Sequence, residues 1–177
     1  KQLNQTNKIG LKALIHESGR EKPLSISDVV FGLGPMINAA GRLADAHTAV
    51  HLMLSKNKYV AYDNARTLKR RNEKRKELDT IIGEEIKMLF KQLPNWESYK
   101  SVVLFQPHWH KGVIGIAASR VVEHFNRPAV ILTESNGVAV GSARSLRGFN
   151  IYHALRECAD LLENFGGHAY AAGLTLE

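Results

Sequence analysis

The chain has little cysteine, few prolines and no long apolar run, and each of these features limits the structures that it can form. One cysteine, Cys158, excludes a disulfide framework and indicates a reducing compartment, for which we expect the cytoplasm. No apolar run approaches the length of a membrane span, and the first residues carry no signal-peptide pattern, so we expect no membrane association. Only five prolines occur, and none lies between Tyr59 and Leu93, so a long helix can form there.

Basic residues outnumber acidic ones. The 177 residues include 24 Lys and Arg against 17 Asp and Glu, which gives a formal net charge of +7. Such an excess favours a polyanionic partner. The hydrophobic share of 44% and the charged share of 23% are those of a soluble globular protein. The length suffices for one good domain or two small ones.

Apolar spacing predicts a helical first third of the chain. A helix is expected over residues 4–19, with Gly19 after its end, and hydroxyls at Ser25 and Ser27 can cap the next one. Gly32 and the Gly34-Pro35 pair break the regular pattern, so a loop is expected to hold Asn38 and Arg42.

A long helix is predicted over residues 59–94. Apolar residues at both ends keep a helical stripe, and the centre is polar. A helix of this extent reaches roughly 50 Å. The pattern predicts a connector between two domains. The basic run at residues 69–76 is then either a solvated face or a surface that follows phosphates.

The last part of the chain alternates strand and helix patterns. Strands are predicted over 101–105, 128–132, 137–141 and 171–176, and helices over 112–125 and from Asn150 to Leu162, with a glycine-rich turn at 165–168. The predicted fold class is therefore α/β: a helical N-terminal segment, a long connector helix, and a small α/β domain with a mixed sheet.

Two polar stretches in this domain form a candidate phosphate site. The first offers two hydroxyls and a guanidinium at Ser142, Arg144 and Ser145, and an Arg fork matches phosphate oxygens two at a time. The second places His168 after Gly166 and Gly167, where glycines leave main-chain N–H groups uncovered or provide clearance. The alternatives are strand-end polar groups and a histidine that braces a turn.

These stretches carry a resemblance to a known family. Gly167-His168 with Ala171-Ala172-Gly173 resembles the terminal motif of the DHH phosphoesterase superfamily, in its associated C-terminal domain, and Gly-Ser-x-Arg-Ser at 141–145 resembles the motif before it. The stretches 109–120 (Trp-His-Lys-Gly…) and 34–43 (Gly-Pro-Met-Ile-Asn…) are similar to RecJ-type single-stranded-DNA-specific exonucleases. The resemblance runs from about Ile9 to the end of the chain.

The resemblance implies an organisation and an activity. Residues 1–58 would be the C-terminal end of the DHH catalytic domain, 59–94 the connector helix, and 95–177 the DHH-associated substrate-binding domain. The parent protein would degrade single-stranded DNA from the 5′ end with Mn²⁺ or Mg²⁺, in recombination and repair. Arg144, Ser142 and His168 would hold phosphates, and Asn38 and Arg42 would hold the substrate or organise the metal site. For Asn38 and Arg42 the alternatives are a turn residue and a surface ion pair.

The Asp-His-His motif that names the superfamily is absent from the sequence. Metal ligands are therefore expected upstream of Lys1, and these residues are expected to bind no metal, to hold no catalytic residue and to be inactive alone. Two other functions stay open: an oligonucleotide phosphatase or nanoRNase of the same superfamily, and a non-catalytic nucleic-acid-binding module. Partners beyond single-stranded DNA are not indicated.

Overall fold

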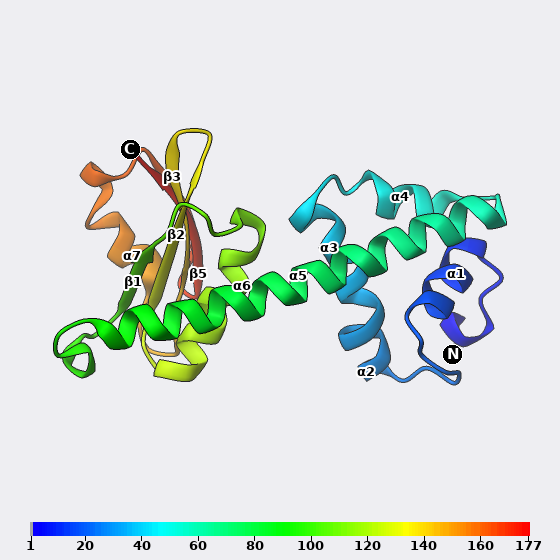
Figure 1. Ribbon diagram of the computed structural model, residues 1–177, viewed down its shortest axis with the longest axis horizontal. Coiled ribbons are helices and arrows are strands. Elements are labelled where there is room, and N and C mark those ends of the chain that lie inside the picture. Colours follow the sequence, from blue (N-terminus) through cyan, green and yellow to red (C-terminus); the bar gives the residue numbers. More distant parts are fainter. Residues whose placement is uncertain (1) are drawn as a thin grey trace. The chain divides into compact units, whose positions relative to one another are not determined.

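The computed structural model describes residues 2–177, which form two compact units divided between Glu77 and Leu78. The division lies inside the long helix α5 (Lys58–Gln92; Figure 1). The predicted long helix is thus confirmed, and it ends before Asn95, which adopts a left-handed conformation with φ 53°. Because α5 contributes residues to both units, the predicted domain limits at residues 58 and 94 stay a prediction.

The N-terminal unit is helical. It contains the 3-10 helix η1 (Gln2–Gln5), α1 (Ile9–Glu17), α2 (Ile26–Asp28), the π-helix η2 (Val29–Leu33), α3 (Gly34–Leu43), α4 (His47–Leu54) and the first part of α5. Its core is built from buried residues of η2, α1, α3, α4 and α5, among them Leu14, Met36, Leu52 and Leu68. Ser25 caps α2, as expected for a hydroxyl at this place, and it does so in a capping box with Asp28.

Two predictions for this unit need correction. The loop expected around Asn38 and Arg42 is helix α3, because Pro35 lies in the first turn, where a helix does not need its N–H. The helix expected over 4–19 is shorter, since α1 begins only at Ile9. Its end is as predicted: Gly19 follows with φ 68°, and its N–H reaches the carbonyl of His16.

The C-terminal unit contains a five-stranded sheet with the order β1-β2-β3-β5-β4. Besides the second part of α5, its elements are the 3-10 helix η3 (Trp96–Ser98), β1 (Val102–Phe105), α6 (Lys111–Phe125), β2 (Ala129–Ser135), β3 (Val138–Arg144), α7 (Ile151–Arg156), the 3-10 helix η4 (Ala159–Leu161), β4 (Asn164–His168) and β5 (Ala171–Leu176). Only β1 and β2 pair in parallel, so the sheet is mixed, as predicted. Helices α6 and α7 lie on opposite faces of this sheet (Figure 1).

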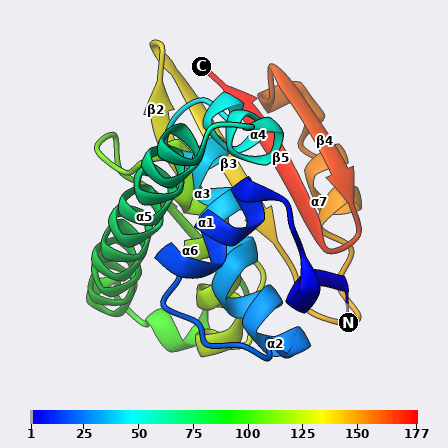
Figure 2. The ribbon, with the colours of Figure 1, turned by 90° about the vertical axis from the view of Figure 1, so that its right-hand side faces the viewer.

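The glycine-rich stretch is a strand rather than the predicted turn. Gly166 pairs with Gly173, Gly167 with Ala172 and His168 with Ala171, and Figure 2 shows β4 beside β5. Glycines lower strand propensity, which is why the sequence pattern indicated a turn. The helix expected from Asn150 to Leu162 is also shorter. Asn150 caps it as predicted, through a bond from the N–H of His153, but α7 ends at Arg156.

No helix formed by residues 2–177 combines the length and the apolar character that a membrane crossing requires.

Candidate nucleic-acid interface

Strand pairing brings the two predicted polar stretches onto one face of the sheet. Across β3, β5 and β4, one row of paired residues runs Arg144–Ala171–His168 and another runs Ser142–Gly173–Gly166. Side chains two residues apart on a strand share a face, so both rows project to the same side. Two strand spacings separate the ends of each row, roughly 10 Å between Cα atoms. We call this surface the glycine shelf.

The middle of the glycine shelf carries almost no side chains. Gly166 and Gly173 are exposed, and Ala171 contributes only a methyl group. A methyl group added at Gly166 would meet nothing within 4 Å. Helix α6 packs against the same face over β2 and β3, where Ile131 and Thr133 are fully buried. The shelf is therefore an open floor beside α6, with Arg144 and His168 at opposite sides.

Two neutral groups help to hold the guanidinium of Arg144 in place. Its Nη1 donates to the Ser142 hydroxyl at 2.9 Å and to the carbonyl of Ala143 at 2.8 Å. A Cβ at Gly115 of α6 would lie 2.9 Å from Arg144 Nη2 and 2.9 Å from Ser142 Oγ. Gly115 thus leaves the space that the guanidinium occupies. A cation fixed in this way loses little conformational freedom when an anion binds.

His168 is exposed, and the backbone selects its tautomer. Its Nδ1 lies 3.3 Å from the N–H of Tyr170 and accepts that hydrogen bond. A neutral histidine that accepts at Nδ1 carries its proton on Nε2. The ring therefore presents a donor, as a phosphate oxygen requires, even without a positive charge.

Ser145 and Gly167 lie beside the shelf and contribute in other ways. The Ser145 hydroxyl donates to the carbonyl of Phe149 at 2.8 Å and closes the loop after β3. Gly167 has φ 154°, and a Cβ there would lie 2.5 Å from Cα of Ala172, so this glycine lets β4 and β5 pair closely. A direct contact of either residue with a substrate stays a prediction.

Asn38 and Arg42 belong to the other unit. Both are exposed and lie four residues apart on α3, hence on one face of that helix. Their expected contribution to a substrate or metal site stays a prediction.

The Trp109–Arg120 stretch has a structural role that the sequence did not reveal. Trp109 is 3% exposed, its Nε1 donates to Glu85 of α5 at 2.9 Å, and its carbonyl accepts from Thr133 Oγ1 at 2.6 Å. His108 Nε2 lies 3.0 Å from the same Glu85 carboxylate. Burial raises the pKa of Glu85, but the bonds from Trp109 and His108 outweigh it and hold the pKa below its usual value. No local pattern could point to Glu85, which lies 24 residues from Trp109.

His110 caps helix α6, since its Nδ1 accepts from the N–H of Gly112 at 3.1 Å. Within residues 2–177, no three or more His, Cys, Asp or Glu side chains gather in a way that could hold a metal ion.

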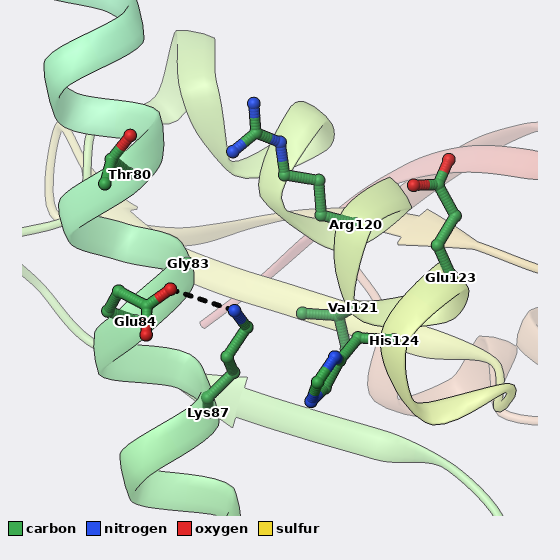
Figure 3. Close-up of a pocket in the computed structure, with 8 residues that line it drawn as sticks. All are labelled: Thr80, Gly83, Glu84, Lys87, Arg120, Val121, Glu123 and His124. Carbon is green, nitrogen blue, oxygen red and sulfur yellow. Dashed lines mark hydrogen bonds and ion pairs between the residues drawn. The ribbon is translucent and has the colours of Figure 1, made fainter.

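A cavity of about 330 Å³ between α5 and α6 is another candidate (Figure 3). Lys87 Nζ lies 2.9 Å from Glu84 in its wall, and Arg120 Nη2 lies 2.9 Å from the fully buried Asp79. Glu123 adds a further carboxylate. Because carboxylates balance the cations here, the cavity suits a polyanion less well than the glycine shelf does.

Comparisons with known proteins agree with this architecture. Residues 98–177 match the model of the DHHA1 domain. The chain is 41% identical to the single-stranded-DNA-specific exonuclease RecJ of Bacillus subtilis (strain 168), over 99% of this chain and 22% of that protein. The crystal structures of RecJ from Thermus thermophilus with Mg²⁺ and with Mn²⁺ match with TM-scores of 0.87 and 0.86 at 31% and 32% identity.

Both structural matches cover 99% of this chain, and 27% and 25% of the respective RecJ chains. The chain thus spans about a quarter of the length of these relatives. Because the matches cover 99% of this chain, they include the long helix and the mixed sheet. The chain therefore belongs to the RecJ family, and its residues 98–177 form the DHHA1 domain.

Proposed function

We propose that this chain is the substrate-holding part of a single-stranded-DNA-specific exonuclease, which hydrolyses phosphodiester bonds from the 5′ end in DNA recombination and repair. The observation that carries the proposal is the strand register, which places Arg144 and His168 on opposite sides of an open glycine floor. The RecJ relatives are single-stranded-DNA-specific exonucleases, and they supply the reaction class of the proposal. The single cysteine fits work in the reducing cytoplasm.

The glycine shelf is suited to a phosphate of the DNA backbone. Arg144 supplies a fixed positive charge, His168 an Nε2 donor and Ser142 a hydroxyl, while the glycines let the strand approach the sheet. Contacts to phosphates give affinity and position without reading sequence. This is what an enzyme needs if it is to step along any single strand. Asn38 and Arg42 would add contacts from α3.

Divalent ions complete the proposed enzyme. RecJ of Thermus thermophilus has been crystallised with Mg²⁺ and with Mn²⁺, and such ions stabilise the attacking and leaving oxygens of a phosphodiester. We place their ligands in a part of the parent protein outside this chain. The residues of this chain would bind the strand and set which bond meets the metals. Alone they would hold DNA without cleaving it.

Binding of a 5′-phosphorylated oligothymidylate to the chain, followed by fluorescence anisotropy at several salt concentrations, tests the proposal. Arg144→Ala is expected to weaken binding by about 10- to 100-fold, because charge-assisted hydrogen bonds to a phosphate are lost. It should also flatten the dependence of affinity on salt. The matched control is Arg147→Ala, which removes the same charge from an exposed position in the neighbouring loop. Equal affinities for Arg144→Ala and the wild type would refute the shelf as the phosphate site.

A second prediction concerns the glycine beneath Arg144. Gly115→Ala is expected to weaken oligonucleotide binding severalfold, because the new methyl group would displace Arg144 Nη2 and Ser142 Oγ. Stability should not fall, since both displaced atoms end flexible side chains and alanine favours a helix by up to about 1 kcal/mol over glycine. Thermal unfolding and anisotropy on the same samples separate these effects.

Gly83→Ala in α5 is the control for Gly115→Ala. Its Cβ would meet nothing within 4 Å, so it should stabilise the helix and leave binding unchanged. Wild-type affinity in Gly115→Ala would show that the position of Arg144 does not matter for binding.

A further inference from the structure

One aromatic side chain at the edge of the glycine shelf has no role in the core. Tyr170 lies in the two-residue turn between β4 and β5, and it is 55% exposed. The hydrophobic core under α7 does not include it. Its ring meets the ring of His168 edge to face, with centroids 6.4 Å apart. A large aromatic ring thus faces solvent directly beside a proposed phosphate ligand.

The backbone under this ring is fastened on both sides. The N–H of Tyr170 donates to His168 Nδ1 at 3.3 Å, and its carbonyl accepts from the N–H of Ser145 at 3.0 Å. The carbonyl of Ala169 accepts from the N–H of Ile151 at 3.1 Å. The turn is therefore tied to the end of β3 and to the start of α7. A ring carried by such a turn keeps its place relative to Arg144 and His168.

We propose that Tyr170 is a stacking platform for the base of the nucleotide whose phosphate lies on the glycine shelf. This inference rests on the proposed function and extends it from the phosphate to the base. Proteins that bind single strands without sequence preference combine a basic surface with aromatic rings, because every base has a face that can stack. A ring 6.4 Å from the His168 ring lies within the reach of one nucleotide.

Stacking on Tyr170 also gives a physical basis for preferring single strands. A base inside a duplex already stacks on its neighbours and pairs with its partner, so it reaches a protein ring only after unstacking and unpairing. A base in a free single strand has no pairing partner, so it does not have to unpair before it stacks on the ring. Tyr170 would therefore favour single strands over blunt duplex ends, although phosphate contacts alone do not distinguish them.

The test compares two oligonucleotides in the binding assay: a 5′-phosphorylated oligothymidylate, and the same oligomer with an abasic residue at its 5′ end. Tyr170→Ala is expected to lose about tenfold in affinity for the first and to match the wild type on the second. Tyr170→Phe keeps the ring and should stay within about twofold of the wild type on both. Thermal unfolding of each variant checks that the turn is intact.

The outcomes distinguish the two proposals. If Arg144→Ala weakens binding and Tyr170→Ala does not, the platform is wrong and the phosphate site stands. If Tyr170→Ala weakens the binding of both oligonucleotides equally, its ring supports the turn or a phosphate contact, and stacking is again refuted. If the wild type binds neither oligonucleotide, both proposals fail together.

Discussion

Gly167→Ala is expected to disrupt the pairing of β4 with β5 and, with it, the binding of DNA. Gly167 has φ 154°, a conformation that residues with a Cβ rarely adopt. The added methyl group would lie 2.5 Å from Cα of Ala172 and would also meet the carbonyl of Ala171. Both obstacles are backbone and cannot rotate away. We therefore expect a loss of more than about 3 kcal/mol in the free energy of unfolding.

Gly166→Ala is the matched control, one residue away on the same strand. A Cβ at Gly166 would meet nothing within 4 Å, so the fold should be kept. Its methyl group would stand on the floor of the shelf, and DNA binding should weaken without a loss of stability. Thermal unfolding and anisotropy are measured on both variants, and a drop in Tm of more than about 10 °C is expected only for Gly167→Ala. Equal Tm values would refute the close pairing at Gly167.

Trp109→Ala is expected to destabilise the C-terminal unit by about 3–5 kcal/mol. The substitution leaves a cavity at a side chain that is 3% exposed, and it removes the Nε1 donor of Glu85. It also loosens the segment before α6, the helix that carries Gly115 beneath Arg144. The measurement is urea unfolding followed by circular dichroism, because Trp109 is one of only two tryptophans and its removal would change the fluorescence signal.

His108→Ala separates packing from the polar contact. His108 shares the Glu85 carboxylate, but its side chain is 59% exposed. Its loss should therefore cost no more than about 1 kcal/mol. Trp109→Phe should fall between the two, since it keeps a ring in the core and loses the hydrogen bond. If His108→Ala is as damaging as Trp109→Ala, the stability of this segment depends on the Glu85 contacts and not on burial of the indole.

Local sequence sufficed wherever neighbours along the chain decide the structure. The capping box at Ser25 and Asp28, the end of α1 at Gly19 and the cap of α7 at Asn150 are all made within a few residues. The long helix follows in the same way from a stretch without proline. The polar residues of the candidate site could be selected because arginine, serine and histidine beside glycines have a recognisable chemistry, and the resemblance to a family named their expected partner.

Tertiary structure alone decided how these residues meet. Gly166 and Gly167 have poor strand propensity, and they form a strand because they pair with β5, the next strand along the chain, which is itself paired with the distant strand β3. The same pairing places Arg144 level with His168, although 24 residues separate them in the sequence. The partnership of Glu85 with Trp109 and the space left by Gly115 also depend on elements packing together. The sequence by itself determined which groups are available to hold a phosphate, because that depends on residue type. Only the sheet register decided that they share one open surface, because register is set by pairing between distant segments.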